Sequence, residues 1–169
     1  GNIVWSLYKD RKGTLWIGTA AGLGRFENGR ITTYSVEQGL FDNDVYQILE
    51  DDFDNLWMSC PKGVFRVAKQ QLDDFSNGVV PRLTCTTYGR ADGMRSEVCT
   101  HYFQPAGWKA ADGRLWFPTT KGAVMIDTAR FAAKPEPPPV IIEDVIVDNE
   151  TLDLTESVDL APGKERFEF

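Results

Sequence analysis

Acidic residues gather in short polar stretches of the chain and are the first candidates for chemistry. Asp51, Asp52 and Asp54 lie close together, and carboxylate oxygens are ligands that Ca²⁺ prefers. The stretch lacks the central Gly and the distal Glu of a calcium-binding loop. Asp10 and Asp112 occupy the corresponding turns elsewhere in the chain, so a hydrogen-bonded turn is the favoured interpretation. We therefore expect no metal site in these stretches.

The residues needed for catalysis are poorly represented. His101 is the one histidine of the sequence, so a metal cage built from several histidines is not available. The sequence contains no Gly-x-Ser-x-Gly nucleophile elbow. Carboxylates are plentiful enough for glycoside chemistry, but no motif brings a pair of them together. We expect no catalytic residue and no cofactor in this chain.

Three cysteines, Cys60, Cys85 and Cys99, have neither an even count nor metal-ligand spacing. Cysteine is often buried as a free thiol, which is one interpretation. A bridge between Cys85 and Cys99, formed in an oxidising compartment, is the alternative.

A repeated sequence motif indicates which strands and turns position the candidate residues. Each copy has Leu-Trp, with Gly six positions after the Trp: Trp16 with Gly22, Trp57 with Gly63, and Trp116 with Gly122. Trp16 and Trp57 are 41 residues apart, which matches the period of a four-stranded propeller blade. Repeated tryptophans are expected to pack between neighbouring blades. The glycines are expected to mark turns with unusual backbone angles.

The predicted fold is all-β: a partial β-propeller of about three four-stranded blades, followed by a partial immunoglobulin-like β-sandwich. The units are blades over residues 1–39 and 40–93, an incomplete closing blade over 94–130, a proline-rich linker over 131–139 and sandwich strands over 140–169. The second blade carries an insertion with a short helix over residues 69–78. Strands are expected over residues 102–107, 115–118 and 124–127 of the third blade. Asn28-Gly29 is a strong hairpin signal.

Charge and hydropathy exclude some partners. The net charge is −7 and the sequence pI is about 4.7, and no basic stripe is present that would neutralise nucleic-acid phosphates. No run of about 18 apolar residues occurs. We expect no nucleic-acid partner and no direct membrane insertion.

Candidate ligand contacts are the residues that the repeat places on the face around the propeller channel. They are Trp5, Asn43, Asp44, Tyr46, Lys62, Arg95, Glu97, His101, Tyr102 and Lys121. Charged, amide and aromatic groups at a concave mouth suit a small polar ligand such as a carbohydrate. Ordinary surface loops are the competing interpretation.

The repeat resembles that of the two-component regulator propeller family. The resemblance rests on the stretch from Asp10 to Leu23, on Gly39-Leu40-Phe41-Asp42-Asn43-Asp44-Val45, and on two closing-blade stretches, Asp92 to Glu97 and Asp112 to Thr119. Residues from Pro137 onward resemble the start of the immunoglobulin-like module that follows such propellers. Ser59-Cys60 in place of Gly-Thr, and Ala123 in place of a larger aliphatic residue, depart from the pattern.

The resemblance implies an extracytoplasmic, periplasmic sensor region of a bacterial inner-membrane protein. It implies a histidine kinase or diguanylate cyclase as the output domain, outside these residues. A protein-interaction propeller is the alternative, and a propeller glycosidase or lyase is the third possibility. Both ends of the chain resemble cut ends of a longer protein. Three blades do not close a ring, so exposed edges are expected to cause self-association.

Overall fold

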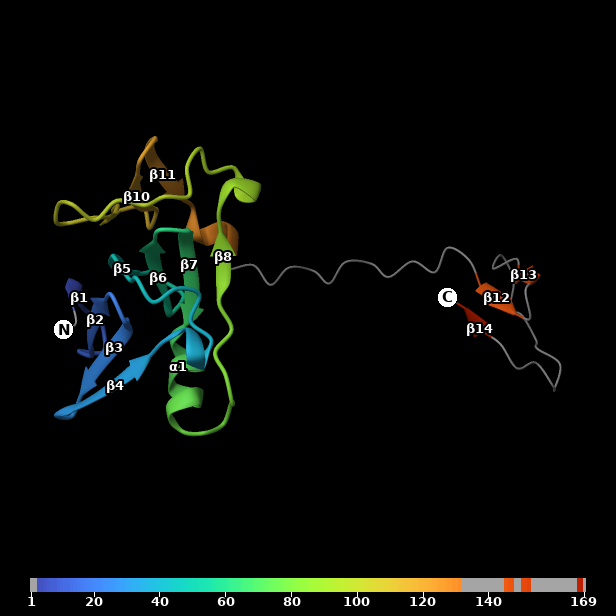
Figure 1. Ribbon diagram of the computed structural model, residues 1–169, viewed down its shortest axis with the longest axis horizontal. Helices are drawn as coiled ribbons and strands as arrows, with labels where there is room; N and C mark the ends of the chain where they lie inside the picture. The colour runs from blue at the N-terminus through green and yellow to red at the C-terminus, as the bar shows by residue number, and fades with distance from the viewer. Residues whose placement is uncertain (1–2, 132–144, 148–149, 153–166, 169) are drawn as a thin grey trace. The chain divides into compact units, whose positions relative to one another are not determined.

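The computed structural model describes residues 3–131, 145–147, 150–152 and 167–168. The chain divides into two compact units, Gly1–Ala133 and Lys134–Phe169. The first unit contains three antiparallel sheets, coloured from blue to orange in Figure 1. Among the helices described, none has the length and apolar character needed to cross a membrane.

The first sheet is a four-stranded meander. Its strands are β1 (Val4–Lys9), β2 (Leu15–Thr19), β3 (Gly22–Glu27) and β4 (Arg30–Tyr34), paired in the order β1-β2-β3-β4. Asn28 and Gly29 both have positive φ, at 51° and 76°, as a two-residue hairpin turn requires. The predicted hairpin is therefore confirmed. A 3₁₀ helix, η1 (Val36–Gln38), leads to the second sheet.

The second sheet repeats this meander with an insertion. Its strands are β5 (Gln47–Glu50), β6 (Asn55–Cys60), β7 (Gly63–Ala68) and β8 (Thr86–Tyr88). Helix α1 (Lys69–Ser76) lies between β7 and β8 and confirms the predicted helix. A second 3₁₀ helix, η2 (Arg90–Asp92), follows β8.

The third sheet has three strands, in the order β11-β10-β9. They are β9 (Trp108–Lys109), β10 (Leu115–Thr119) and β11 (Gly122–Ile126), with η3 (Thr128–Phe131) after them. The strand predicted over residues 102–107 is wrong, because this segment is a loop. Cys99 pairs with Thr119, and Trp108 pairs with Trp116. Cys99 and Trp108 are 108 − 99 = 9 positions apart, whereas their partners Thr119 and Trp116 are 119 − 116 = 3 positions apart, so the excess residues form a loop outside the sheet.

Two apolar cores lie between consecutive sheets. Trp16, only 2% exposed, belongs to a cluster with Ile48, Met58 and Leu72 of the second blade. Trp57 is fully buried in a second cluster with Leu115 and Phe117 of the third. The repeat therefore produces blades that stack through their tryptophans, which is how a propeller forms its core. The described residues thus have the predicted all-β, partial-propeller architecture.

The second unit is described only in part. Its strands are β12 (Val145–Val147), β13 (Glu150–Leu152) and β14 (Phe167–Glu168), paired in the order β13-β12-β14. Residues 132–139 of the predicted linker lie outside the described residues, as does most of the segment 140–169. The immunoglobulin-like sandwich stays a prediction.

Candidate ligand-binding face

Four of the predicted contact residues form one aromatic cluster. Trp5 lies on β1, Tyr46 immediately before β5, and His101 and Tyr102 in the loop that interrupts the inner side of the third sheet. The imidazole of His101 lies 4.3 Å from the ring of Trp5 and 4.2 Å from the ring of Tyr46, measured between centroids. Tyr102 lies 4.9 Å from His101 on the same measure. Side chains from three blades therefore meet around one histidine.

The loop that carries His101 is tied to both other blades. Gln104 Nε2 donates a hydrogen bond of 2.9 Å to the backbone oxygen of Trp5. The backbone N–H of Ala106 donates to Gln47 Oε1 at 3.1 Å. These two bonds hold residues 101–107 across the inner strands β5 and β1. The sequence alone does not indicate this crossing, because the partners are 59 and 99 positions apart.

The cluster has a buried base and an exposed end. Burial raises the pKa of Tyr46 to about 12, with further contributions from the charges of Asp44 and Asp42, so its hydroxyl stays protonated at neutral pH. The indole nitrogen of Trp5 is buried without a hydrogen-bond partner. Tyr102 and its neighbour Phe103 are 76% and 85% exposed. Such a gradient leaves one aromatic ring free to contact a ligand while the others fix its position.

A second group of predicted residues makes hydrogen bonds within the loop before β5. Asn43 Oδ1 accepts from the backbone N–H of Val36 at 3.0 Å. Lys62 forms an ion pair of 3.0 Å with Asp42, whose carboxylate also accepts from the backbone N–H of Asp44. These contacts shape the loop beside Tyr46.

The remaining predicted residues lie on the third blade. Arg95 and Lys121 line a hollow of about 240 Å³ beside β11. Glu97 forms an ion pair of 3.8 Å with Arg90. The structure therefore brings together four of the predicted residues in the aromatic cluster, and the others make separate contacts.

The acidic turns of the first two blades accept hydrogen bonds from the repeated tryptophans. Asp10 Oδ1 accepts from the backbone N–H groups of Lys12 and Thr14, and Oδ2 accepts from the indole of Trp16 at 3.0 Å. Asp51 accepts from Trp57 Nε1 at 2.7 Å in the same way. The carboxylates thus close turns, as expected. Within the described residues, no group of His, Cys, Asp and Glu is arranged to hold a metal ion.

A buried ion-pair network between the first and second blades was not found from the sequence. Lys69, only 4% exposed, donates from Nζ to Glu50 at 2.5 Å and to Asp10 at 3.2 Å. Arg11 reaches Glu50 from the rim at 3.4 Å. Burial by itself lowers the pKa of Lys69, but the hydrogen bonds and charges of Glu50 and Asp10 outweigh it and the pKa is raised. The position of Lys69 at the start of the insertion did not indicate that its side chain would be buried between two carboxylates.

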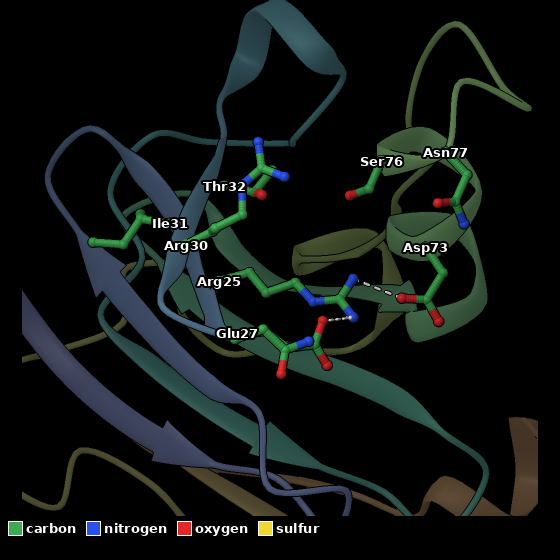
Figure 2. A pocket seen from close by; sticks show the side chains of 9 residues that line it. Arg25, Glu27, Arg30, Ile31, Thr32, Asp73, Ser76 and Asn77 are labelled. Atoms are coloured by element: carbon green, nitrogen blue, oxygen red, sulfur yellow. Dashed lines mark hydrogen bonds and ion pairs between the residues drawn. The ribbon is translucent and has the colours of Figure 1, made fainter.

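A polar groove of about 530 Å³ is lined by none of the predicted ligand contacts (Figure 2). It runs between the β3–β4 hairpin and α1. Arg25 pairs there with Asp73 at 2.6 Å and with Glu27 at 2.9 Å, while its guanidinium lies 5.5 Å from the ring centroid of Trp16. The groove therefore belongs to the packing between the first two blades.

All three cysteines are free thiols, so the alternative of a Cys85–Cys99 bridge is wrong. Burial raises the pKa of Cys60 to about 12 and the pKa values of Cys85 and Cys99 to about 11. These thiols are protonated at neutral pH and serve as small core residues.

Comparison with known proteins supports the architecture. Residues 1–21 and 39–62 match the family model described as two component regulator propeller. The extracellular domain of the putative hybrid two component system BT3049 from B. thetaiotaomicron is similar in structure, with a TM-score of 0.65 and 19% identity over 90% of this chain and 20% of that chain. The corresponding domain of BT4673 gives a TM-score of 0.61 and 21% identity over 75% and 17% of the two chains. No curated protein matches the sequence significantly.

These comparisons confirm the resemblance to the regulator propeller repeat for the matched residues. At identities near 20%, the structural likeness establishes the propeller fold. The chain spans about a fifth of the length of these solved chains.

Proposed function

We propose that this chain is part of the extracytoplasmic sensor region of a bacterial signalling protein. The family match over the first two blades and the likeness to extracellular domains of putative hybrid two component systems support this assignment. The region binds a small polar ligand, such as a carbohydrate, and relays its presence to an output domain outside these residues. A membrane-anchored histidine kinase or diguanylate cyclase is the expected parent. We assign no catalysis to these residues.

The aromatic cluster carries the ligand part of the proposal. Trp5, Tyr46 and His101 hold Tyr102 at an exposed position. A sugar ring has an apolar C–H face that packs on an aromatic ring and hydroxyls that bond to polar neighbours, so this composition suits it. Because the cluster joins three blades, a ligand bound there has direct contact with elements that a change in blade packing would move.

Oligosaccharide binding tests this function. The full chain is titrated by calorimetry with maltohexaose, cellohexaose, xylohexaose and chitohexaose. At least one is expected to bind, and Tyr102→Ala weakens that binding about tenfold because the exposed platform is lost. Phe103→Ala is the matched control, since Phe103 is also highly exposed, at 85% against 76% for Tyr102, but lies outside the cluster's ring contacts. No binding by any sugar, or equal losses from both variants, would contradict the carbohydrate assignment.

A protein-interaction role is the second candidate function. Phe103 is the most exposed large apolar side chain of the described residues and follows Tyr102 in the chain. Exposed neighbouring aromatic rings are typical anchors at protein interfaces. An effect of Phe103→Ala larger than that of Tyr102→Ala on capture of a protein partner favours this role.

We also propose that the chain self-associates through its outermost sheet faces. The third blade exposes a cross-strand row of Trp108, Trp116 and Met125. The first blade exposes Leu7 and Ile31. In a propeller, such faces contact further blades, so two copies bury them by stacking one on the other.

A further inference from the structure

The polar groove of Figure 2 differs in chemistry from the aromatic cluster. Its volume of about 530 Å³ lies within the range of small-molecule sites. Two guanidinium groups, two carboxylates, two amides and two hydroxyls line it together with Ile31, and among the described residues no aromatic ring does so. A sugar would have no ring to pack on in this groove. The lining therefore suits a ligand of another class.

The two walls of the groove come from the first hairpin and from the insertion of the second blade. Arg25 pairs with Thr32, and Glu27 pairs with Arg30, across strands β3 and β4, so these four side chains lie on one face of the hairpin. Helix α1 supplies the other wall, where Asp73 binds Arg25. In the first blade a two-residue turn, and no helix, joins the third and fourth strands. The groove therefore depends on the insertion.

Arg25 holds two carboxylates at the base of the groove. Its guanidinium binds Asp73 Oδ1 at 2.6 Å and Glu27 Oε2 at 2.9 Å, and its side chain is less exposed than either carboxylate. The guanidinium also lies 5.5 Å from the ring centroid of the buried Trp16, which restricts its movement. One cation against two carboxylates leaves one negative charge uncompensated at the base.

The end of α1 adds to this negative side. The last carbonyl groups of a helix carry a partial negative charge. Helix α1 ends at Ser76, Asn77 is its C-cap, and its last turn contains no basic residue. Both residues line the groove. This wall therefore favours a positively charged group of a ligand.

The hairpin wall carries a cation that is available to a ligand. Arg30 lies opposite Glu27 in the hairpin, but Glu27 binds Arg25 instead, and Arg30 has no ion pair within the described part of the chain. Figure 2 shows the guanidinium of Arg30 pointing away from Glu27. A free guanidinium can bind a carboxylate through two parallel hydrogen bonds. The two cations and two carboxylates of the groove cancel in sum, but they leave a positive wall and a negative wall.

Opposite charges on two walls, with no net charge, match a ligand that carries both signs. We propose that the groove binds a short zwitterion, either a free amino acid or a peptide of two or three residues. The carboxylate of the ligand binds Arg30, and its ammonium group binds Asp73 beside the end of α1. Arg25 is a positioning residue, because it holds Asp73 in place. The groove shares no lining residue with the aromatic cluster, so it is a second site.

Calorimetric titration of the full chain tests this site with L-alanine, dialanine and trialanine. At least one of these probes is expected to bind saturably. The N-acetylated and the C-amidated forms of that probe are each expected to bind at least about tenfold more weakly, because each lacks one of the two charges. Absence of binding by all three probes, or an analogue that binds as tightly as the unmodified probe, overturns the proposal.

Arg30→Gln and Arg90→Gln form a matched pair of variants. Arg30→Gln is expected to weaken binding of the same probe about tenfold, because it removes the cation that binds the carboxylate. The side chain of Arg90 is 65% exposed and does not line the groove, so Arg90→Gln should stay within about threefold of the parent. Equal losses from both variants overturn the assignment to this groove.

The oligosaccharides used for the aromatic cluster separate the two sites. Arg30→Gln is expected to leave the binding of every hexaose unchanged, whereas Tyr102→Ala should leave the binding of the zwitterion unchanged. A hexaose whose binding Arg30→Gln weakens about tenfold would identify a sugar as the occupant of the groove and would overturn the proposal. Failure of the chain to bind any hexaose bears on the aromatic cluster alone.

Discussion

The second and third blades use the same repeated tryptophan in different surroundings. Trp57 is fully buried, donates its indole hydrogen bond to Asp51, and lies 5.4 Å from the guanidinium of Arg66. Trp116 is 39% exposed and lies opposite Met125, and Ala110 stands six positions before it where the earlier copies have aspartate. The third copy lacks both polar partners. The Asp–Trp–Arg arrangement thus accompanies a tryptophan covered by another blade.

The largest expected difference between the two blades concerns stability. Trp57→Ala leaves a large cavity between blades and is expected to lower the free energy of unfolding by about 4 kcal/mol. Trp116→Ala removes a partly exposed ring and is expected to cost about 1 kcal/mol or less. Urea denaturation followed by circular dichroism measures both. Equal losses would show that the third blade's tryptophan is buried in solution.

The same pair of variants examines self-association. If copies stack through the exposed row of the third blade, light scattering shows Trp116→Ala shifting the chain towards the monomer at a given concentration. A parent chain that stays monomeric at high concentration would contradict the self-association proposal.

A smaller but substantial effect is expected at the contact between the first and second blades. Lys69→Met leaves the carboxylates of Asp10 and Glu50 buried without their cation, which is expected to cost about 3 kcal/mol. Lys62→Met is the matched control, because Lys62 is 66% exposed in its pair with Asp42, and solvent screening should make its loss much less costly. Thermal and urea unfolding of both variants give the comparison. Similar costs would mean that the buried network contributes no more than a surface pair.

The smallest expected effect is on the free energy of unfolding at acidic pH. Burial of Asp10 by itself raises its pKa, but the hydrogen bonds from Trp16, Lys69 and Thr14 outweigh it and hold the pKa below the usual 3.8. A depressed carboxyl pKa stabilises the fold above its unfolded value, and this contribution is lost as the pH falls through the folded pKa. The free energy of unfolding should therefore fall below about pH 4.

Asp10→Asn should flatten this fall, because asparagine does not titrate. The exposed Asp112, whose pKa is lowered by its hydrogen bond with Arg114, is the control. Asp112→Asn should leave the slope almost unchanged, because solvent screens an exposed pair. The measurement is urea denaturation between pH 3 and pH 6, and parallel slopes in the parent and Asp10→Asn would refute the assignment.

Much of the scaffold follows from local patterns. The Leu-Trp phrase, the Asn28-Gly29 turn and the break at Pro61-Lys62-Gly63 define strands whose pairing is between sequence neighbours, so short-range rules suffice. The strand predicted over residues 102–107 is a loop in the structure, although its aromatic residues have high strand propensity. Its anchoring to Trp5 and Gln47 is long-range and overrides that propensity.

In the candidate site, too, some features follow from the local sequence and others depend on long-range contacts. The repeat placed Trp5, Tyr46, His101 and Tyr102 on one face, and the structure brings their rings together. Nothing in the spacing indicated that Asn43 would bond to Val36, or that Lys69 would be buried among carboxylates. Such contacts depend on the angle between blades, which no single repeat encodes.

The sequence by itself determined the repeat, the identity of most strands and the acidic turns, since each depends on residues within one blade. The tertiary structure alone decided which tryptophan is covered and which lysine is buried. Copies of one sequence motif fold into the same hairpin, but the burial of each tryptophan depends on what packs against that hairpin. For that reason Trp57 and Trp116, written alike in the sequence, occupy different environments in the molecule.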